Sequence, residues 1–275
     1  MDTKIIFASG GLGNQLFQYA YYLLLLKQGY NAKLNLDSYK ITKQHNGWEV
    51  SSIFNIKPNI TPTSYLSVLK TKILGHFKFK FCTLKETNYM GYDSKWLSPS
   101  KRYLIGCWIN PKYVNPIELE LKRILKFTQI DDYNRSLVDK MKKENSISLH
   151  IRRGDFLKST YYNVCDSKYY TTAINIIKDK LKNPKFYIFS DEPEWCREFI
   201  KQFDVDFEII DHNRNEESYK DMFLISQCNS NIIANSNFSW WCAWLNENKN
   251  KIVIAPKIWS KRITNSPNIE SWICI

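Results

Sequence analysis

Closely spaced cysteine pairs are missing from this 275-residue sequence. Its seven cysteines are scattered and odd in number, and none forms a Cys-x-x-Cys spacing. Structural zinc sites are built on such spacings, so we expect no bound metal. We also expect no signal peptide, because the chain leads from Met1 into a short strand pattern at residues 4–8. We therefore expect reduced thiols in a cytoplasmic protein.

Long apolar runs, internal repeats and Pro/Gly-rich linkers are also absent. The most apolar stretch, residues 16–26, is about half the length of a bilayer span and predicts a buried helix. With 44% hydrophobic and 24% charged residues, the composition is that of a globular protein. The length predicts two domains, at residues 1–135 and 136–275, with a polar helix pattern at 131–144 marking their join. We expect the last ~15 residues to pack back on the N-terminal domain.

Acidic residues are missing altogether between Lys57 and Lys85, a stretch that carries six lysines. The whole chain has a formal net charge of +12, which favours anionic partners such as nucleotides, nucleic acid or an acidic membrane surface. Within the basic stretch, residues 77–81 alternate phenylalanine with lysine, as a strand with two different faces would. This stretch is either a solvated face or a patch that meets anionic lipid headgroups.

Strand and helix patterns alternate along the chain, and most regularly in its second half. There we predict strands at 147–151, 186–190, 206–210, 231–234 and 251–255, and helices at 168–181, 193–202, 216–228 and 238–245. The first half shows strands at 4–8, 32–37 and 102–108, and helices at 64–74 and 116–125. Such alternation predicts βαβ units and parallel sheets, with a nucleotide-binding second half.

The strand pattern at 147–151 ends in His150-Ile151-Arg152-Arg153-Gly154-Asp155. In open α/β sheets, ligands bind outside the carboxyl ends of the strands, and planar arginine forks suit phosphate oxygens. A surface ion pair that closes the strand is the other interpretation of these residues. His150 is either a histidine packed within the strand or a catalytic group.

Three other segments could bind a ligand. Gly10-Gly11-Leu12-Gly13-Asn14 joins a strand to a helix, either as a ligand loop or as a tight turn, and it does not fit Gly-x-Gly-x-x-Gly. The segment 235–239 opens a helix, where its amides and hydroxyls could bind phosphate or where Ser236 or Ser239 could be an ordinary N-cap. Asp221 is either a solvated carboxylate or an acceptor for the paired N–H groups of guanine.

Four motifs together resemble the bacterial α-1,2-fucosyltransferases of glycosyltransferase family 11; they are residues 10–20, 150–155, 189–192 and 235–245. The resemblance implies a GT-B architecture, in which two Rossmann-like domains face each other across a cleft. It implies that GDP-β-L-fucose binds mainly to the C-terminal domain and that no metal or other cofactor is required. Fucose would pass with inversion to the 2-hydroxyl of a galactose in an O-antigen, a capsule or another oligosaccharide, including a lipid-linked glycan.

The resemblance also implies roles for individual residues. Arg152 would grip the β-phosphate, and Asn14 would reach the donor or the acceptor hydroxyl, so these two are the expected catalytic residues. The expected donor-binding residues are His150, Arg153, Asp155, Asp191, Asp221, Ser236, Asn237, Ser239, Gly11 and Gly13. Asp221 would hold the guanine, because it precedes a Leu-x-Ser-Gln run at 224–227. The sequence identifies no catalytic base.

Alternative hypotheses change the substrates or the class of protein. The same fold could use another GDP-sugar or an acceptor other than galactose. A basic nucleic-acid-binding protein would interleave basic residues with stacking aromatics, but here three of the tryptophans fall in one helix pattern at 240–244, where burial is the simpler explanation. We therefore expect no nucleic-acid partner. The basic stretch suggests a peripheral contact with the inner face of the membrane.

Overall fold

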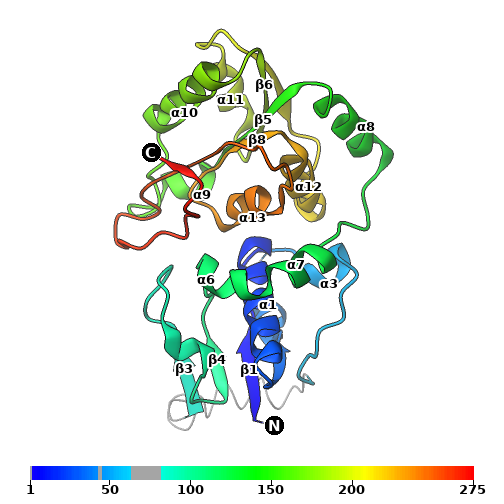
Figure 1. The fold of residues 1–275 in the computed structure, drawn as a ribbon, viewed down its shortest axis with the longest axis vertical. Coiled ribbons are helices and arrows are strands. Elements are labelled where there is room, and N and C mark those ends of the chain that lie inside the picture. Colours follow the sequence, from blue (N-terminus) through cyan, green and yellow to red (C-terminus); the bar gives the residue numbers. More distant parts are fainter. Residues whose placement is uncertain (1, 43–44, 63–81) are drawn as a thin grey trace. The chain divides into compact units, whose positions relative to one another are not determined.

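The computed structural model describes residues 2–42, 45–62 and 82–275, which form two compact units, Met1–Thr128 and Gln129–Ile275 (Figure 1). The join predicted at 135/136 would cut helix α8 (Asp132–Met141), which belongs to the second unit and is tied to it by hydrogen bonds between Asn134 and Asn213. The predicted helix at 64–74 and the alternating segment at 77–81 lie outside the described residues, as does most of the basic stretch.

The first unit is built on parallel strands. Within the described residues they are β1 (Thr3–Phe7), β2 (Asn31–Asn35), β3 (Thr83–Lys85) and β4 (Tyr103–Ile105), in the order β2-β1-β4-β3. Its helical segments are α1 (Leu12–Lys27), α2 (Asp37–Thr42), α3 (Val50–Ile53), η1 (Ser94–Leu97), α6 (Pro111–Val114), η2 (Asn115–Ile117) and α7 (Glu118–Ile124). Helix α1 is buried over most of its length, so the buried helix predicted at 16–26 is confirmed.

Strand β4 is shorter than the predicted 102–108. The chain leaves the sheet at Gly106, and Trp108 takes a left-handed conformation with φ of 51°. The carboxylate of Glu86 accepts hydrogen bonds from the amides of Cys107 at 2.7 Å and Trp108 at 3.2 Å, which satisfies backbone groups that would otherwise pair in the sheet.

The second unit is a doubly wound parallel sheet. Its strands are β5 (Asn145–Ile151), β6 (Pro184–Ser190), β7 (Asp206–Ile210), β8 (Ser230–Ile232), β9 (Val253–Ala255) and β10 (Ile273–Cys274), in the order β10-β9-β8-β5-β6-β7. Besides α8, its helical segments are α9 (Gly154–Leu157), α10 (Ser167–Lys180), α11 (Pro193–Ile200), η3 (Asn215–Glu217), α12 (Tyr219–Gln227) and α13 (Asn237–Leu245). The predicted alternation of strands and helices is confirmed.

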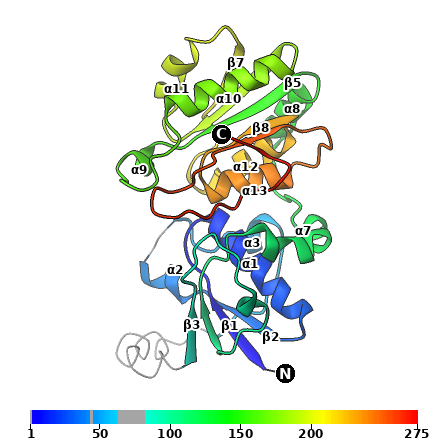
Figure 2. The ribbon, with the colours of Figure 1, turned by 60° about the vertical axis from the view of Figure 1, so that its left-hand side comes forward.

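The two faces of this sheet differ in chemistry. One face presents Ile147, Leu149 and Ile151 of β5 to an apolar cluster made with α10 and α11 (Figure 2). The other face presents Ser148 and His150, and there α12 and α13 pack. Strand β5 is therefore buried on both faces, as central parallel strands are. Each fully buried isoleucine contributes about 1.5–3 kcal/mol to folding.

The C-terminal segment completes the sheet of the second unit. We expected it to pack back on the N-terminal domain, but Ile273 and Cys274 pair in parallel with β9. Trp272 is 7% exposed and lies 5.9 Å, centroid to centroid, from Trp240 of α13. The edge of the second sheet explains the difference, because it leaves Trp272 buried and Ile273 partly buried.

All seven cysteines carry free thiols. Among the described residues, none of the helices has the length and apolar character needed to cross a bilayer.

Candidate functional site

The expected site residues of the second unit gather at one edge of its sheet. Because strands β5, β6, β7 and β8 are parallel, the segments that follow them leave the sheet at the same edge. Those segments begin at Arg152, Asp191, Asp211 and Ile233, and helix α12 starts at this edge too, since it follows β7 after a short loop. Topology alone therefore brings the arginines, Asp191, Asp221 and the start of α13 to one side of the unit.

Arg152 is held between two carboxylates. Its Nη2 lies 2.7 Å from Asp155 Oδ1, and its Nη1 lies 3.2 Å from Asp191 Oδ2. The Arg152 side chain is 37% exposed and that of Asp155 is 64% exposed, whereas that of Asp191 is 24% exposed. The predicted guanidinium is thus oriented by one partly buried carboxylate and one exposed carboxylate, and remains accessible to an anion.

Asp191 fixes the loop that carries both arginines. Besides its ion pair with Arg152, its Oδ1 accepts a hydrogen bond from the backbone amide of Arg153 at 3.0 Å. A Cβ added at Gly154 would lie 2.7 Å from Asp191 Oδ2, closer than real Cβ atoms approach an oxygen. Glycine is therefore required at position 154 by the close approach of Asp191, and the tight loop is a consequence of that contact.

Arg153 has a different environment from Arg152. Its guanidinium carbon lies 3.8 Å from the ring centroid of Trp195, and its Nε donates to Glu192 Oε2 at 3.0 Å. Stacking on tryptophan and pairing with a carboxylate both hold a guanidinium in place. The structure therefore distinguishes the two arginines: Arg153 is anchored to α11, and Arg152 is the more exposed group.

His150 and Ser239 contact each other beneath this loop. The serine Oγ lies 2.5 Å from His150 Nδ1, and both residues are buried. Burial, together with the nearby Arg152 guanidinium, lowers the pKa of His150 to about 4. The histidine is therefore neutral at pH 7, and it is packed within the strand against Ser239.

Helix α13 begins beside that contact. Ser236 is its N-cap residue with extended backbone, and its side chain makes no capping hydrogen bond. Ser236 and Asn237 are partly exposed, whereas Ser239, one turn further on, is completely buried. The first turn of α13 thus presents Ser236 and Asn237 at the same edge as Arg152.

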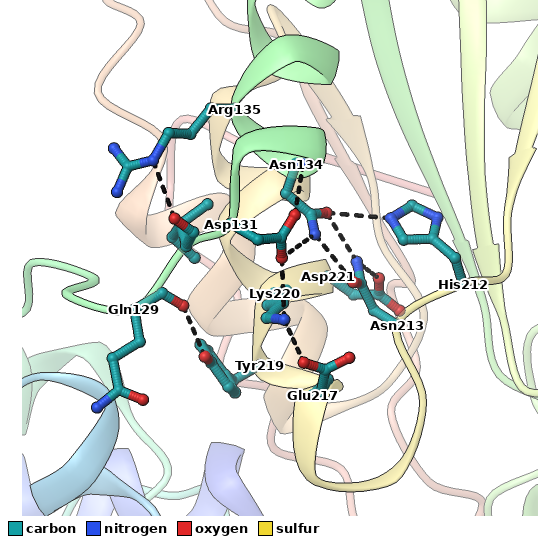
Figure 3. Close-up of polar contacts among 11 residues, drawn as sticks. Gln129, Asp131, Asn134, Arg135, His212, Asn213, Glu217, Tyr219, Lys220 and Asp221 are labelled. Carbon is teal, nitrogen blue, oxygen red and sulfur yellow. Dashed lines mark hydrogen bonds and ion pairs between the residues drawn. The ribbon is translucent and has the colours of Figure 1, made fainter.

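Asp221 lies in the first turn of α12, next to α13; burial raises the pKa of the Cys242 thiol of α13, and the nearby Asp221 acts in the same direction. Its Oδ1 accepts a hydrogen bond from Asn213 Nδ2 at 2.9 Å (Figure 3). Burial raises the pKa of Asp221 from an ordinary 3.8 to about 7, although the bond from Asn213 acts in the opposite direction. A carboxylate with such a pKa is a candidate ligand-binding group rather than a solvated surface charge.

The glycine loop belongs to the first unit. Gly10 has φ of +84°, and a Cβ there would lie 2.5 Å from Asn14 Nδ2, so both its conformation and its neighbour require glycine. Gly11 is the N-cap of α1, and its carbonyl accepts from the amides of Asn14 and Gln15. Gly13 is buried, and Asn14 is partly exposed at the start of the helix.

Two glutamines, not among the predicted site residues, hold this loop. Gln18 accepts from the Ser9 amide at 3.1 Å and donates to the Gly106 carbonyl, and Gln15 donates to the carbonyls of Gly10 and Gly47. Both side chains are fully buried. Polar residues within an otherwise apolar helix pattern were the signal that could have identified them.

Among the described residues, no group of three or more histidine, cysteine or acidic side chains is arranged to hold a metal ion.

Parallel α/β units that carry polar groups at the carboxyl ends of their strands are typical of nucleotide-binding proteins. The structure is similar to that of the fucosyltransferase NodZ from Bradyrhizobium, with a TM-score of 0.51 at 11% identity over 88% of this chain and 93% of that one. The predicted GT-B fold class is thereby confirmed.

The profile of Glycosyl transferase family 11 matches residues 5–275, so the chain belongs to that family and is a glycosyltransferase. It is 32% identical to the Alpha-1,2-colitosyltransferase of Escherichia coli over 100% of this chain and 99% of that protein. It is 29% identical to the O-antigen biosynthesis glycosyltransferase WbnK of Escherichia coli, covering 96% of this chain and 98% of that one. A shorter match, 30% identical, covers 36% of this chain and 28% of the human Galactoside alpha-(1,2)-fucosyltransferase 1.

Proposed function

We propose that this protein transfers L-fucose, with inversion, from GDP-β-L-fucose to the 2-hydroxyl of a galactose in a bacterial O-antigen or a related oligosaccharide. The whole-chain match to family 11 and the α-1,2 linkage named for two of its relatives support the type of reaction. The observation that carries the proposal in this structure is Arg152, an accessible guanidinium at the carboxyl edge of the sheet that Asp191 holds in place.

Arg152 stabilises the leaving group. When the bond between fucose C1 and the β-phosphate oxygen breaks, its electron pair goes to that oxygen, so negative charge grows on GDP while the sugar becomes cationic. The galactose oxygen then bonds to C1 from the opposite face, and its proton passes to solvent. A guanidinium placed at the developing phosphate charge in comparable reactions is worth about 10³ to 10⁵ in rate.

The two carboxylates around Arg152 have different parts in donor binding. Asp155 is largely exposed, and its exposed ion pair is worth only about 0–1 kcal/mol, so the diphosphate can replace it. Asp191 stays as the anchor, because it also binds the Arg153 amide. Arg153 shapes the loop from its place on Trp195.

Other residues complete the donor site. Asp221, when ionised, accepts hydrogen bonds from N1–H and the 2-amino group of guanine, and Ser236 and Asn237 contact the phosphates from the start of α13. His150 and Ser239 support the arginine loop from below, since both are buried. In the first unit, Gly11 and Gly13 let the backbone of the loop approach the substrates, and Asn14 contacts the donor or the acceptor hydroxyl.

Arginine and backbone amides supply the charge stabilisation, so we propose that the reaction needs no divalent metal. Initial transfer rates measured with and without a chelator test this statement, and we expect them to agree. Rates restored only by added Mg²⁺ or Mn²⁺ would contradict it. We also propose a peripheral membrane contact through the basic stretch; fractionation that leaves all of the enzyme soluble at low salt would contradict that proposal.

The test of the function uses Arg152→Ala with Arg197→Ala as a matched control. Arg197 also pairs with a carboxylate at 2.7 Å, that of Asp211, and is 41% exposed, but it lies on α11 and carries no proposed role in transfer. With GDP-fucose and a β-galactoside acceptor, we expect Arg152→Ala to lose at least about 10³-fold in turnover and Arg197→Ala to keep wild-type turnover. An Arg152→Ala enzyme that is folded and retains more than a tenth of the activity would refute the assignment.

A second donor is favoured by the 32% identity to an α-1,2-colitosyltransferase. Colitose is the 3-deoxy form of fucose, so the same site could take GDP-colitose without any change in how the nucleotide binds. Comparing kcat/KM for GDP-fucose, GDP-colitose and GDP-mannose distinguishes the two donors. The same measurements over β-galactosides that differ in the next sugar would identify the acceptor.

A further inference from the structure

Asp221 is oriented by a pair of buried asparagines. Asn213 follows strand β7 and is 7% exposed, and Asn134 lies in the first turn of α8 and is 1% exposed. Figure 3 shows the two side-chain amides between the carboxylates of Asp131 and Asp221. These residues come from three separate elements of the second unit, yet they form one continuous chain of hydrogen bonds.

The two amides bind each other reciprocally. Asn213 Nδ2 donates to Asn134 Oδ1 at 3.0 Å, and Asn134 Nδ2 donates to Asn213 Oδ1 at 3.1 Å. The second hydrogen of each amide goes to a carboxylate: that of Asn134 to Asp131 Oδ2 at 2.8 Å, and that of Asn213 to Asp221 Oδ1 at 2.9 Å. All four amide hydrogens are therefore used.

The carboxylates at the two ends fix the direction of this chain. An ionised carboxylate only accepts hydrogen bonds, so turning either amide over would place two oxygens against each other. Asp131 is held in the ionised state, because hydrogen bonds from the backbone amide of Asn134 and from Lys220 lower its pKa. The Nζ of Lys220 lies 2.9 Å from Asp131 Oδ2. His212 Nε2 also contacts Asn134 Oδ1 at 3.1 Å, as a donor in this arrangement.

This geometry leaves the outer part of the Asp221 carboxylate for a ligand. Asn213 occupies Oδ1 from one side, and Oδ2 has no hydrogen-bond partner among residues 2–42, 45–62 and 82–275. Two parallel N–H donors, such as N1–H and the 2-amino group of guanine, need both carboxylate oxygens at a fixed angle. Rotation of the carboxylate would lose one of the two bonds.

We propose that Asn213, held by Asn134, is a positioning residue that sets the angle of the Asp221 carboxylate and thereby lets the enzyme distinguish guanine from purines that lack the 2-amino group. The inference rests on the proposed guanine contact of Asp221 and adds to it the origin of its selectivity. Asn213 and Asn134 touch no substrate themselves. They act through Asp221.

A purely structural function of the same pair would be to join α8 to the loop after β7. Such a function predicts a loss of stability and no change in base selectivity. The two possibilities are therefore separated by a ratio of affinities, which a general loss of folded protein does not alter.

The experiment measures the dissociation constants of GDP and of inosine diphosphate, which lacks the 2-amino group, by titration calorimetry at pH 8. The proteins are the wild type, Asp221→Asn, Asn213→Ala, Asn134→Ala and a control, Asn246→Ala. Asn246 is likewise buried, at 3% exposure, and bonded to another asparagine, Asn231, but it contacts neither Asp221 nor Asn213. Circular dichroism checks that each variant is folded.

We expect the wild type to prefer GDP over inosine diphosphate by roughly 10- to 100-fold, the value of one charge-assisted hydrogen bond. In Asn213→Ala the preference for GDP should fall to about threefold or less, and the donor KM should rise while kcat stays unchanged. In Asn134→Ala the preference for GDP should also fall. Asn246→Ala should keep the wild-type preference.

If Asn213→Ala and Asn134→Ala kept the preference for GDP while Asp221→Asn lost it, the positioning role would be overturned. The proposed function would then remain intact. An unchanged affinity and preference in Asp221→Asn would instead show that Asp221 does not hold the base, and the guanine contact would fail together with this inference. Asn134→Ala keeps the test decisive if Asn213→Ala does not fold.

Discussion

Replacing Asp221 by asparagine distinguishes the effect of this carboxylate on folding stability from its contribution to donor binding. Burial raises its pKa from 3.8 to about 7, which corresponds to at most about 4 kcal/mol of unfavourable free energy for the ionised form in the folded protein. Asparagine keeps an oxygen that can accept the hydrogen bond from Asn213 Nδ2. The new amide hydrogens of the variant need partners, so we expect its free energy of unfolding to rise by roughly 2–3 kcal/mol at pH 8 rather than by the full value.

The sign of the pH dependence follows from the direction of the pKa change. Between pH 4 and 7 the folded wild type binds a proton at Asp221 that the unfolded chain does not, so the wild type gains stability as the pH falls through 7. The variant has no such group. Its advantage in stability should therefore be largest at pH 8 and should disappear by about pH 4.

Thermal unfolding followed by circular dichroism at several pH values measures this difference. A gain of 2–3 kcal/mol raises the Tm of a unit of this size by roughly 5–15 °C at pH 8. In parallel, the affinity for GDP should fall about 10- to 100-fold in the variant, and in the wild type it should weaken as the pH falls below 7 and Asp221 becomes protonated. A difference in Tm that is the same at pH 5 and pH 8, or an unchanged GDP affinity, would refute this reasoning.

The loop that carries Arg152 and Arg153 gives three further predictions. Each is tested by measuring initial transfer rates with GDP-fucose on folded protein. Gly154→Ala places a methyl group 2.7 Å from Asp191 Oδ2, so transfer should fall at least about tenfold; wild-type activity would show that the loop tolerates the displacement. Asp155→Asn breaks an exposed ion pair and should change the donor KM by less than about threefold, whereas Asp191→Asn should raise it by more than about tenfold; equal effects would contradict their different roles. Trp195→Leu removes the surface on which Arg153 stacks and should raise the donor KM about three- to tenfold, with recovery in Trp195→Tyr; no recovery would point to lost packing instead.

Much of the second unit could be predicted from the sequence because its signals are local. The alternation at 147–151 and the helical spacing at 168–181 depend on neighbours in the chain, and parallel pairing follows from their regular succession. The ends of those strands are fixed at the same time, which is why the sequence alone assigns Arg152, Asp191 and Ser236 to one edge of the sheet. The resemblance to family 11 was found in four short motifs, and the family model matches residues 5–275.

Contacts between distant segments could not be predicted in this way. The resemblance favoured Arg152 over Arg153, but only the fold shows that Arg153 stacks on Trp195 while Arg152 remains accessible. The C-terminal segment was misplaced, since its apolar residues suit an edge of either sheet and their order in the chain does not choose between them.

The sequence by itself determined which chemical groups this protein has and at which edge of the sheet they lie, because strand period and chain order fix both. The protonation state and the orientation of these groups were decided by the tertiary structure. His150 is neutral, Asp221 has a pKa near 7, and two asparagines 79 residues apart orient it, because burial and long-range hydrogen bonds depend on what the folded chain places around each group.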